Sequence, residues 1–178
     1  MAKLVTVQID PELMHYLETA WGYEEAHAEV VMVLPRPKAR VLVITKPFYP
    51  PRTFRLPTGG VQPGETPEAA FRRETLEETG LHVEIEAKIA EQVHRCVAGS
   101  DVREITSHIF LGSATSDAPH PIDEAERLSG YAEVGPQGLR ALARNLENLT
   151  GPWQGWGAFR APAHEVVAGY LECSSPDL

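Results

Sequence analysis

Three glutamates in the segment 59–81 are spaced so that one face of a helix would bring them together. Glu77 and Glu78 follow Glu74 by three and four residues, and side chains at that spacing are neighbours on a helix surface. Like charges there destabilise a helix, so removing one of them is expected to leave stability unchanged or slightly higher. A divalent cation would turn the repulsion into ligation, and oxygen-only ligands suit Mg²⁺ or Mn²⁺.

The residues around the glutamates favour the same interpretation. Arg73 stands four residues before Glu77 and can hold that carboxylate in place. Gly59 and Gly60 allow the preceding loop to approach closely, so a backbone carbonyl could add a ligand. A glutamate-rich helix face is usually only solvated, and the helix dipole does not explain acidic groups near a C-terminal end. The surrounding glycines and arginine favour a metal site over a solvated face.

The complete pattern resembles the Nudix box. That box reads Gly, five residues, Glu, seven residues, Arg-Glu, an apolar position, any residue, Glu-Glu, any residue, Gly and an apolar position. The matching residues here are Gly59, Glu65, Arg73, Glu74, Glu77, Glu78, Gly80 and Leu81. Thr75 departs from the pattern, because a larger apolar residue is usual there. We expect this change to adjust packing without removing activity.

The segments around the box extend the resemblance to about residues 26–145. They are the sequence LPTGG at 56–60, two β-rich runs within 27–46 and the stretch 123–142. The resemblance implies an α+β fold, an α/β/α sandwich with a mixed β-sheet between helices. We expect a Nudix domain at 26–150, a strand–helix appendage at 1–25, and an aromatic segment with a last helix at 151–178 that packs on the domain.

The resemblance also implies an activity and a set of site residues. Nudix hydrolases cleave the diphosphate linkage of a nucleoside diphosphate joined to another moiety, so a nucleotide sugar or a nucleoside triphosphate is the expected type of substrate. Mg²⁺ (or Mn²⁺) would be held by Glu74, Glu77 and Glu78 with the Gly59 carbonyl, and Arg73 would orient the carboxylates. Glu65 and Gly80 would have structural roles. Which group serves as the general base stays open.

Further residues are candidates for binding substrate or metal. Arg55 beside the box is the first candidate for a phosphate contact, ahead of Lys46, Arg95 and Arg103. One member of the acidic run Asp123, Glu124 and Glu126 could add a metal ligand or a base, or the run could be a solvated loop. A Pro or Tyr shortly after the box often marks relatives specific for ADP-ribose or dinucleoside polyphosphates. Residues 95–98 are Arg, Cys, Val and Ala, so neither marker is found there.

Two other groups of residues favour a structural role over a chemical one. Trp153, Trp156 and Phe159 could stack on a nucleobase, but aromatic residues near a terminus more often dock the last helix or form a dimer interface. His94 beside Cys96 lacks further ligands at a suitable spacing, so a packed strand is favoured over a metal pair.

The elements that must position the box follow from periodicity and capping signals. We expect a strand at 3–9, a helix from Asp10 to about residue 21, and a hairpin from the two runs within 27–46. A loop should occupy 47–64. The box helix should begin after Thr66 and end at Gly80. Strands should follow at 81–97 and 104–112, and helices at 136–149 and 163–171, with a loop at 151–157.

Composition excludes several functions. Among 178 residues, 25 are Asp or Glu and 16 are Lys or Arg, which gives a net charge of −9, so nucleic acid is an unlikely partner. We expect no transmembrane helix and no secretory signal, and the two distant cysteines fit a reducing cytoplasm. A homodimer is expected because the outer segments offer much apolar surface, namely Leu13, Leu17, Trp21, Trp153 and Trp156.

Two alternatives to hydrolysis remain at this point. One is a non-catalytic Nudix-like module that binds a nucleotide, although such modules commonly lack box glutamates. The other is an isoprenoid diphosphate isomerase, which would need a catalytic cysteine and a histidine-rich metal site outside the box.

Overall fold

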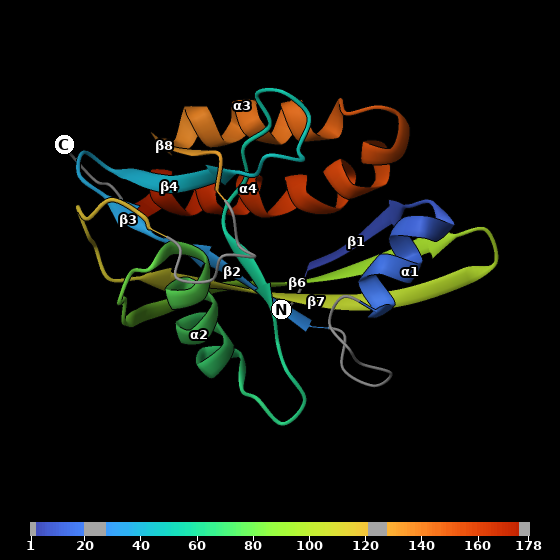
Figure 1. Ribbon diagram of the computed structural model, residues 1–178, viewed down its shortest axis with the longest axis horizontal. Coiled ribbons are helices and arrows are strands. Elements are labelled where there is room, and N and C mark those ends of the chain that lie inside the picture. The colour runs from blue at the N-terminus through green and yellow to red at the C-terminus, as the bar shows by residue number, and fades with distance from the viewer. Residues whose placement is uncertain (1–2, 20–27, 121–127, 175–178) are drawn as a thin grey trace.

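The computed structural model describes residues 3–19, 28–120 and 128–174 (Figure 1). The strands are β1 (Lys3–Gln8), β2 (Ala28–Val33), β3 (Pro35–Arg36), β4 (Arg40–Thr45), β5 (Thr58–Gly60), β6 (Ile85–Ala98), β7 (Asp101–Gly112) and β8 (Gly130–Val134). The helices are α1 (Pro11–Thr19), α2 (Pro67–Thr79), α3 (Pro136–Glu147), a 3₁₀ turn η1 (Gly151–Trp153) and α4 (Gln154–Ser174).

The strands form two sheets. The larger has the order β1-β6-β7-β2-β5, in which β1 is parallel to β6 and β2 to β7, while the other two pairs are antiparallel. The smaller has the order β3-β4-β8 and is antiparallel throughout. An isolated bridge between Ile44 and Arg55 ties β4 to the loop before β5.

Alternation along β2 and β4 produces a sandwich. Val30 and Met32 of β2 pack with Phe71 on the α2 side, whereas Val31 and Val33 join Leu139 of α3 on the opposite side. Successive side chains of a strand point to opposite faces, so a strand with apolar residues at every position must be covered on both. Figure 1 shows α2 on one side of the sheets and α3 with α4 on the other. The expected α/β/α sandwich with a mixed sheet is confirmed.

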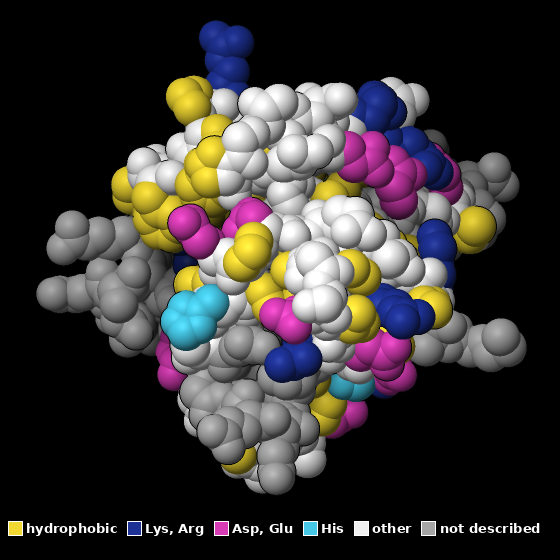
Figure 2. Space-filling view, turned by 90° about the vertical axis from the view of Figure 1, so that its right-hand side faces the viewer, with side chains coloured by type: hydrophobic (Ala, Val, Ile, Leu, Met, Phe, Trp, Pro, Cys, Tyr) yellow, Lys and Arg dark blue, Asp and Glu magenta, His cyan; other side chains and the backbone are white. Residues whose placement is uncertain are grey.

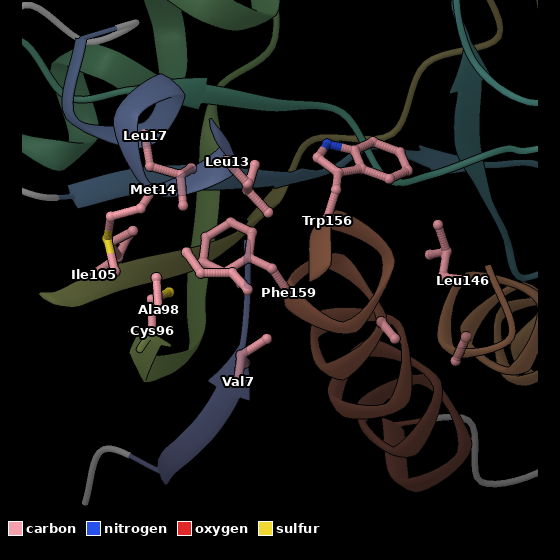
Figure 3. Close-up of a cluster of buried hydrophobic side chains, with 13 residues drawn as sticks. Val7, Leu13, Met14, Leu17, Cys96, Ala98, Ile105, Leu146, Trp156 and Phe159 are labelled. Atoms are coloured by element: carbon pink, nitrogen blue, oxygen red, sulfur yellow. The ribbon is translucent and has the colours of Figure 1, made fainter. Parts of the chain in front are cut away.

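A third apolar cluster lies where the N-terminal strand and helix meet the start of α4 (Figure 3). Side chains from α1, β1 and the start of α4, among them Leu13, Leu17, Trp156 and Phe159, pack over Cys96 of β6 and Ile105 of β7. Leu13, Leu17 and Trp156 are each less than a tenth exposed. The chain therefore buries these side chains itself, which removes the argument that led us to expect a homodimer.

The face in Figure 2 gives that expectation no new support. On the face in Figure 2, hydrophobic side chains form separate groups among charged residues and backbone, with no continuous patch. Trp21, which also entered the argument, lies outside the described residues. The homodimer stays a prediction without a structural basis.

The predicted hairpin within 27–46 is wrong in its pairing. β2 pairs with β7 and β5, whereas β4 pairs with β3 and β8. The turn exists, but it closes β3 on β4, and the Leu42 N–H donates to the Leu34 carbonyl at 3.0 Å where the chain leaves one sheet for the other. Because β2 is covered on both faces, neighbours distant in sequence compete successfully with the local partner.

The prediction for the end of the chain is also wrong. The expected loop at 151–157 is the turn η1 and the start of α4, which begins nine residues before Ala163 and continues through Pro162. A proline inside a helix loses one backbone hydrogen bond, and burial of Trp156, Phe159 and Ala161 compensates for that loss. Gly157 permits this packing, since a Cβ there would collide with the Leu146 carbonyl of α3.

His164 joins α4 to the loop before β5. Its Nε2 accepts a hydrogen bond from the Leu56 N–H at 3.0 Å, and its Nδ1 lies 3.0 Å from the Arg160 carbonyl. These contacts fix a neutral ring that donates from Nδ1. Burial lowers the pKa of His164 to about 4.

Within the described residues, no helix is long and apolar enough to cross a membrane.

We predict that His164→Gln is destabilised less relative to wild type as the pH falls. The unfolded histidine binds a proton below about pH 6.5, whereas the folded one resists protonation until about pH 4. The stability contributed by neutral His164 is therefore complete above pH 6.5 and is lost toward pH 4. The difference in free energy of unfolding should shrink by on the order of 3 kcal/mol. Urea unfolding at pH 8, 6, 5 and 4 measures it, and a constant difference would contradict the prediction.

Candidate functional site

Helix α2 has the predicted ends. The Thr66 side chain accepts a hydrogen bond from the Ala69 N–H at 3.2 Å, and Pro67 fills the first helical position. Gly80 ends the helix with φ 68°, a left-handed conformation that favours glycine. A Cβ at Gly80 would also collide with the His120 carbonyl. Both signals therefore fix which residues of α2 face the site, and Thr75 sits buried with its hydroxyl 3.0 Å from the Met32 sulfur.

The Arg73 guanidinium gathers the carboxylates of the box. Its Nε and Nη2 donate to Glu65 at 3.0 and 2.9 Å, and its Nη1 donates to Glu74 at 2.8 Å and to Glu77 at 2.9 Å. Its Nη2 also reaches the Gly60 carbonyl at 2.8 Å. The hydrogen bond from Arg73 holds the pKa of Glu65 below its ordinary value. One side chain therefore ties the loop before α2 to the helix itself.

Glu74 lies against the loop in a buried position. Burial raises its pKa to about 7, although Arg73 acts in the opposite direction and the charges of Glu78 and Glu77 add to the rise. The absence of a side chain at Gly59 makes this position possible, since a Cβ there would occupy the space of the Glu74 carboxylate. A buried, incompletely neutralised carboxylate is suited to receive a cation.

Glu78 is buried beneath the site between two cations. Its Oε1 lies 3.0 Å from the Lys46 Nζ and 3.1 Å from the Arg55 Nη2, while its Oε2 is buried without a hydrogen bond. Arg55 is fixed further by the Tyr49 hydroxyl at 2.7 Å and the Leu56 carbonyl at 2.8 Å. Lys46 and Arg55 therefore support the carboxylate cluster, and the repulsion that the sequence suggested is neutralised by surrounding cations.

The three glutamates predicted as metal ligands lie in different environments. Glu74 lines a pocket, the Glu77 side chain is 43% exposed, and the Glu78 side chain is 1% exposed. Among the described residues, no three histidine, cysteine, aspartate or glutamate side chains converge in a form that could hold a metal ion as they stand. Arg73, Lys46 and Arg55 hold the carboxylates instead, so their role as a ligand set remains a prediction.

The pocket beside Glu74 has a volume of about 630 Å³, which is within the range of ligand sites. Its box end contains Thr58, Gly59 and Gly60 with Lys46 and Arg55, and it extends toward α1 and the start of α4. The lining residues are Asp10, Glu12, Leu13, Tyr16, Glu29, Lys46, Phe48, Tyr49, Arg55, Thr58, Gly59, Gly60, Glu74, Pro152, Trp153, Trp156 and Arg160.

Four charged residues that line the pocket were not predicted as site residues, namely Asp10, Glu12, Glu29 and Arg160. Glu29, which is only 3% exposed, pairs with Arg160 and accepts a hydrogen bond from the Ser107 hydroxyl at 2.7 Å. The sequence feature that could have revealed Glu29 is a glutamate inside an otherwise apolar strand. Arg160 follows Trp153 and Trp156 at helical spacing, but that signal was lost because residues 151–157 were predicted to be a loop.

Other predicted residues lie away from the site or outside the described part. Asp123, Glu124 and Glu126 fall within 121–127, which the structure does not describe. Arg95 and Arg103 are exposed on β6 and β7 and do not line the pocket.

The His94–Cys96 pair is packed in the strand, as expected. Both side chains are almost completely buried. Burial raises the pKa of the Cys96 thiol to about 12. A thiol in this state is a poor nucleophile, so Cys96 does not support the isomerase alternative.

Comparison with known families decides the identity of the chain. The model of the NUDIX domain matches residues 25–149, more than half of the sequence. The chain belongs to the Nudix hydrolase family. This confirms the resemblance inferred from the box, and members of this family generally use a divalent metal ion. Membership indicates a hydrolase that acts on phosphoric anhydride bonds.

Individual relatives are distant. "Nudix hydrolase 19, chloroplastic" of Arabidopsis thaliana is 41% identical over 54 residues, which are 30% of this chain and 12% of that protein. The chain therefore spans about an eighth of that relative. A Caenorhabditis elegans Ap4A hydrolase has a TM-score of 0.56 at 16% identity, over 83% of this chain and 99% of the other. The Escherichia coli ORF135 protein has a TM-score of 0.56 at 17% identity, over 87% and 99%. Both show the shared fold.

We predict that Glu78→Gln is strongly destabilised. The substitution removes the negative charge that Lys46 and Arg55 share, and breaking such a buried pair costs about 3–5 kcal/mol. Glu77→Gln is the matched control, because Glu77 is half-exposed and makes one ion pair with Arg73. Its cost should stay below about 1 kcal/mol. Urea unfolding of both variants at neutral pH tests this, and equal costs would contradict the arrangement described for Glu78.

Proposed function

We propose that this protein is a Mg²⁺- or Mn²⁺-dependent hydrolase that cleaves the diphosphate linkage of a nucleoside diphosphate joined to another moiety. The observation that supports it most directly is the composition of the pocket. Glu74 and Gly59 of the box form its wall together with Lys46 and Arg55. A carboxylate suited to a metal ion and two cations suited to phosphates therefore face one cavity of nucleotide size.

The residues at the box end have the donor atoms that a hard divalent ion prefers, although among the described residues they do not converge on one point as they stand. The donor set consists of carboxylate and carbonyl oxygens, which such ions prefer. Glu78 Oε2 is buried without a partner, and Glu74 is buried with a raised pKa. Glu74, Glu77 and Glu78 with the Gly59 carbonyl would hold the ion. When bound, it would neutralise phosphate charge and make a water molecule a better nucleophile.

The chain's own residues would position the substrate and offset charge. Arg73 orients Glu74 and Glu77 by donating to both, and it keeps Glu65 and the Gly60 carbonyl in register with them. Lys46 and Arg55 add positive charge at the pocket wall, where a substrate phosphate gains negative charge as the anhydride bond breaks. Tyr49 and Leu56 fix the Arg55 guanidinium, so little reorganisation is needed during the reaction.

We predict that Glu74→Gln lowers hydrolysis by several orders of magnitude. Glutamine keeps the shape but lacks the anionic ligand, and a metal ion's stabilisation of several kcal/mol corresponds to tenfold per 1.36 kcal/mol. Release of a nucleoside monophosphate from a panel of nucleotide sugars and nucleoside triphosphates, with and without Mg²⁺, is the measurement.

Glu84→Gln provides the control for that measurement. The Glu84 side chain is 81% exposed and does not line the pocket, so activity should be unchanged. A Glu74→Gln enzyme that keeps its Mg²⁺-dependent rate within about threefold, far less than one tenfold step, would refute the assignment. A wild-type protein that binds nucleotides but hydrolyses none of the panel would instead be a binding module.

A further inference from the structure

The end of the pocket away from the box has a different chemistry. It lies between α1 and the start of α4 and is lined by Asp10, Glu12, Tyr49, Trp153 and Trp156. Four of these five residues belong to segments outside the 25–149 match. This end therefore belongs to the particular chain, whereas the box end is shared with the family.

Three rings form one aromatic wall, consisting of Tyr49, Trp153 and Trp156. The ring centroids lie 4.9 Å apart for Tyr49–Trp156, 5.2 Å for Trp153–Trp156 and 5.9 Å for Tyr49–Trp153. The rings pack on one another at steep angles, so they leave no gap for a ligand between them. What they offer to the pocket is an outer surface, against which a planar nucleobase can stack.

Docking of α4 alone does not account for this wall. Trp156 is 8% exposed and belongs to the core around Leu13 and Phe159, so docking explains it. Trp153 and Tyr49 are only partly buried against that core. Tyr16 and Phe48 also line the pocket and are 55% and 66% exposed. Aromatic surface concentrated on one open cavity is typical of a binding site.

Arg160 gives a second, independent indication of a ligand. Its side chain is nine-tenths buried, it lines the pocket, and its Nη1 pairs with Glu29. Its Nε is buried without a hydrogen-bond partner. A buried donor is normally satisfied, and Arg160 also lines a second, much smaller cavity, so the missing acceptor is either a water there or an oxygen of a bound nucleotide.

Two carboxylates define which base edge fits. Asp10 caps α1, because its Oδ1 accepts a hydrogen bond from the Leu13 N–H at 2.7 Å, and Glu12 is exposed in the first turn. Carboxylates only accept hydrogen bonds. Guanine presents two adjacent N–H donors, adenine and cytosine present one amino group, and uracil has a single N–H between two carbonyl oxygens.

We propose that the aromatic wall, with Asp10 and Glu12 at its rim, is a nucleoside subsite that selects bases carrying amino groups, guanine above all. This rests on the proposed function only for the direction of the diphosphate, which would point from the wall past Arg160 toward Glu74. The nucleoside is then recognised by the outer segments of the chain, while the box supplies the chemistry.

Direct binding tests the subsite without hydrolysis. Isothermal titration of the wild-type protein with GMP, AMP, CMP, UMP and ribose 5-phosphate should show GMP binding most tightly, UMP most weakly among the nucleotides, and the base-free sugar phosphate weaker still. Trp153→Leu should weaken GMP about tenfold or more, as loss of a base stack does, without affecting ribose 5-phosphate. Trp153→Phe should restore most of the affinity.

Tyr131→Leu is the matched control for the aromatic substitutions. Tyr131 is an exposed aromatic residue on β8 that does not line the pocket, so its replacement should leave GMP binding unchanged. If Trp153→Leu and Tyr131→Leu bind GMP alike, the aromatic wall is not a nucleoside subsite.

Asp10→Asn tests the selectivity. Asparagine caps a helix as well as aspartate does, so the unfolding midpoint should hold, while affinities for GMP and UMP should converge to within about threefold. Glu12→Gln should shift the ratio of the GMP and UMP affinities in the same direction.

Equal affinities for GMP and UMP in the wild type would overturn the selectivity. Hydrolysis without any base dependence would overturn the subsite alone, whereas nucleotide binding without hydrolysis would overturn the proposed function alone.

Discussion

Neutralisation of buried carboxylates is the constraint on which the rest of this structure depends. The charges of Glu77 and Glu78 repel that of Glu74, and Glu74 and Glu78 are largely removed from water, so without compensating cations the cluster would destabilise the packing of α2 on the sheet. Arg73 donates to Glu65, Glu74 and Glu77, while Lys46 and Arg55 share the fourth, Glu78. Lys46 directly follows β4, Arg55 lies in the loop before β5, and Arg73 belongs to α2. Each of those elements must therefore be placed correctly before the site exists.

The sandwich supplies that placement. β2 and β4 are buried on both faces, and α2 covers one of them by packing Phe71 and Ala70 against Met32 and Leu34. β5 extends the same sheet from β2 and carries Gly59 and Gly60 up to the helix. On the other face, His164 of α4 holds the loop at Leu56. The loop is thus fixed from both layers, and Arg55 within it needs no ligand to stay in position.

Signals from neighbouring residues were enough to predict the box helix. They failed where contacts between residues far apart in the sequence determine the structure. The Thr66 cap, the Gly80 stop and the contacts of Arg73 follow from neighbours in sequence, and the structure shows each of them. The pairing of β2 depends on β7, far along the chain, so the hairpin prediction was wrong. The last helix was predicted to begin at Ala163, and only packing against α3 and Ile9 shows that α4 begins earlier. Glu29 and Arg160 were missed because the role of each is apparent only from its ion pair with the other.

The pocket is closed by residues from opposite ends of the chain, and this has a consequence for biosynthesis. Asp10 and Leu13 meet Trp156 and Arg160 across the cavity, and β1 can pair only after β6 has been made. A nascent chain emerging from the ribosome can form α2 long before it can form the far wall. A partial chain that includes α2 but not α4 therefore has the box residues, but a nucleotide finds a complete surface only when the start of α4 has been made. Nucleotide affinity in stalled chains of increasing length would rise abruptly at that point, in step with docking of the two ends.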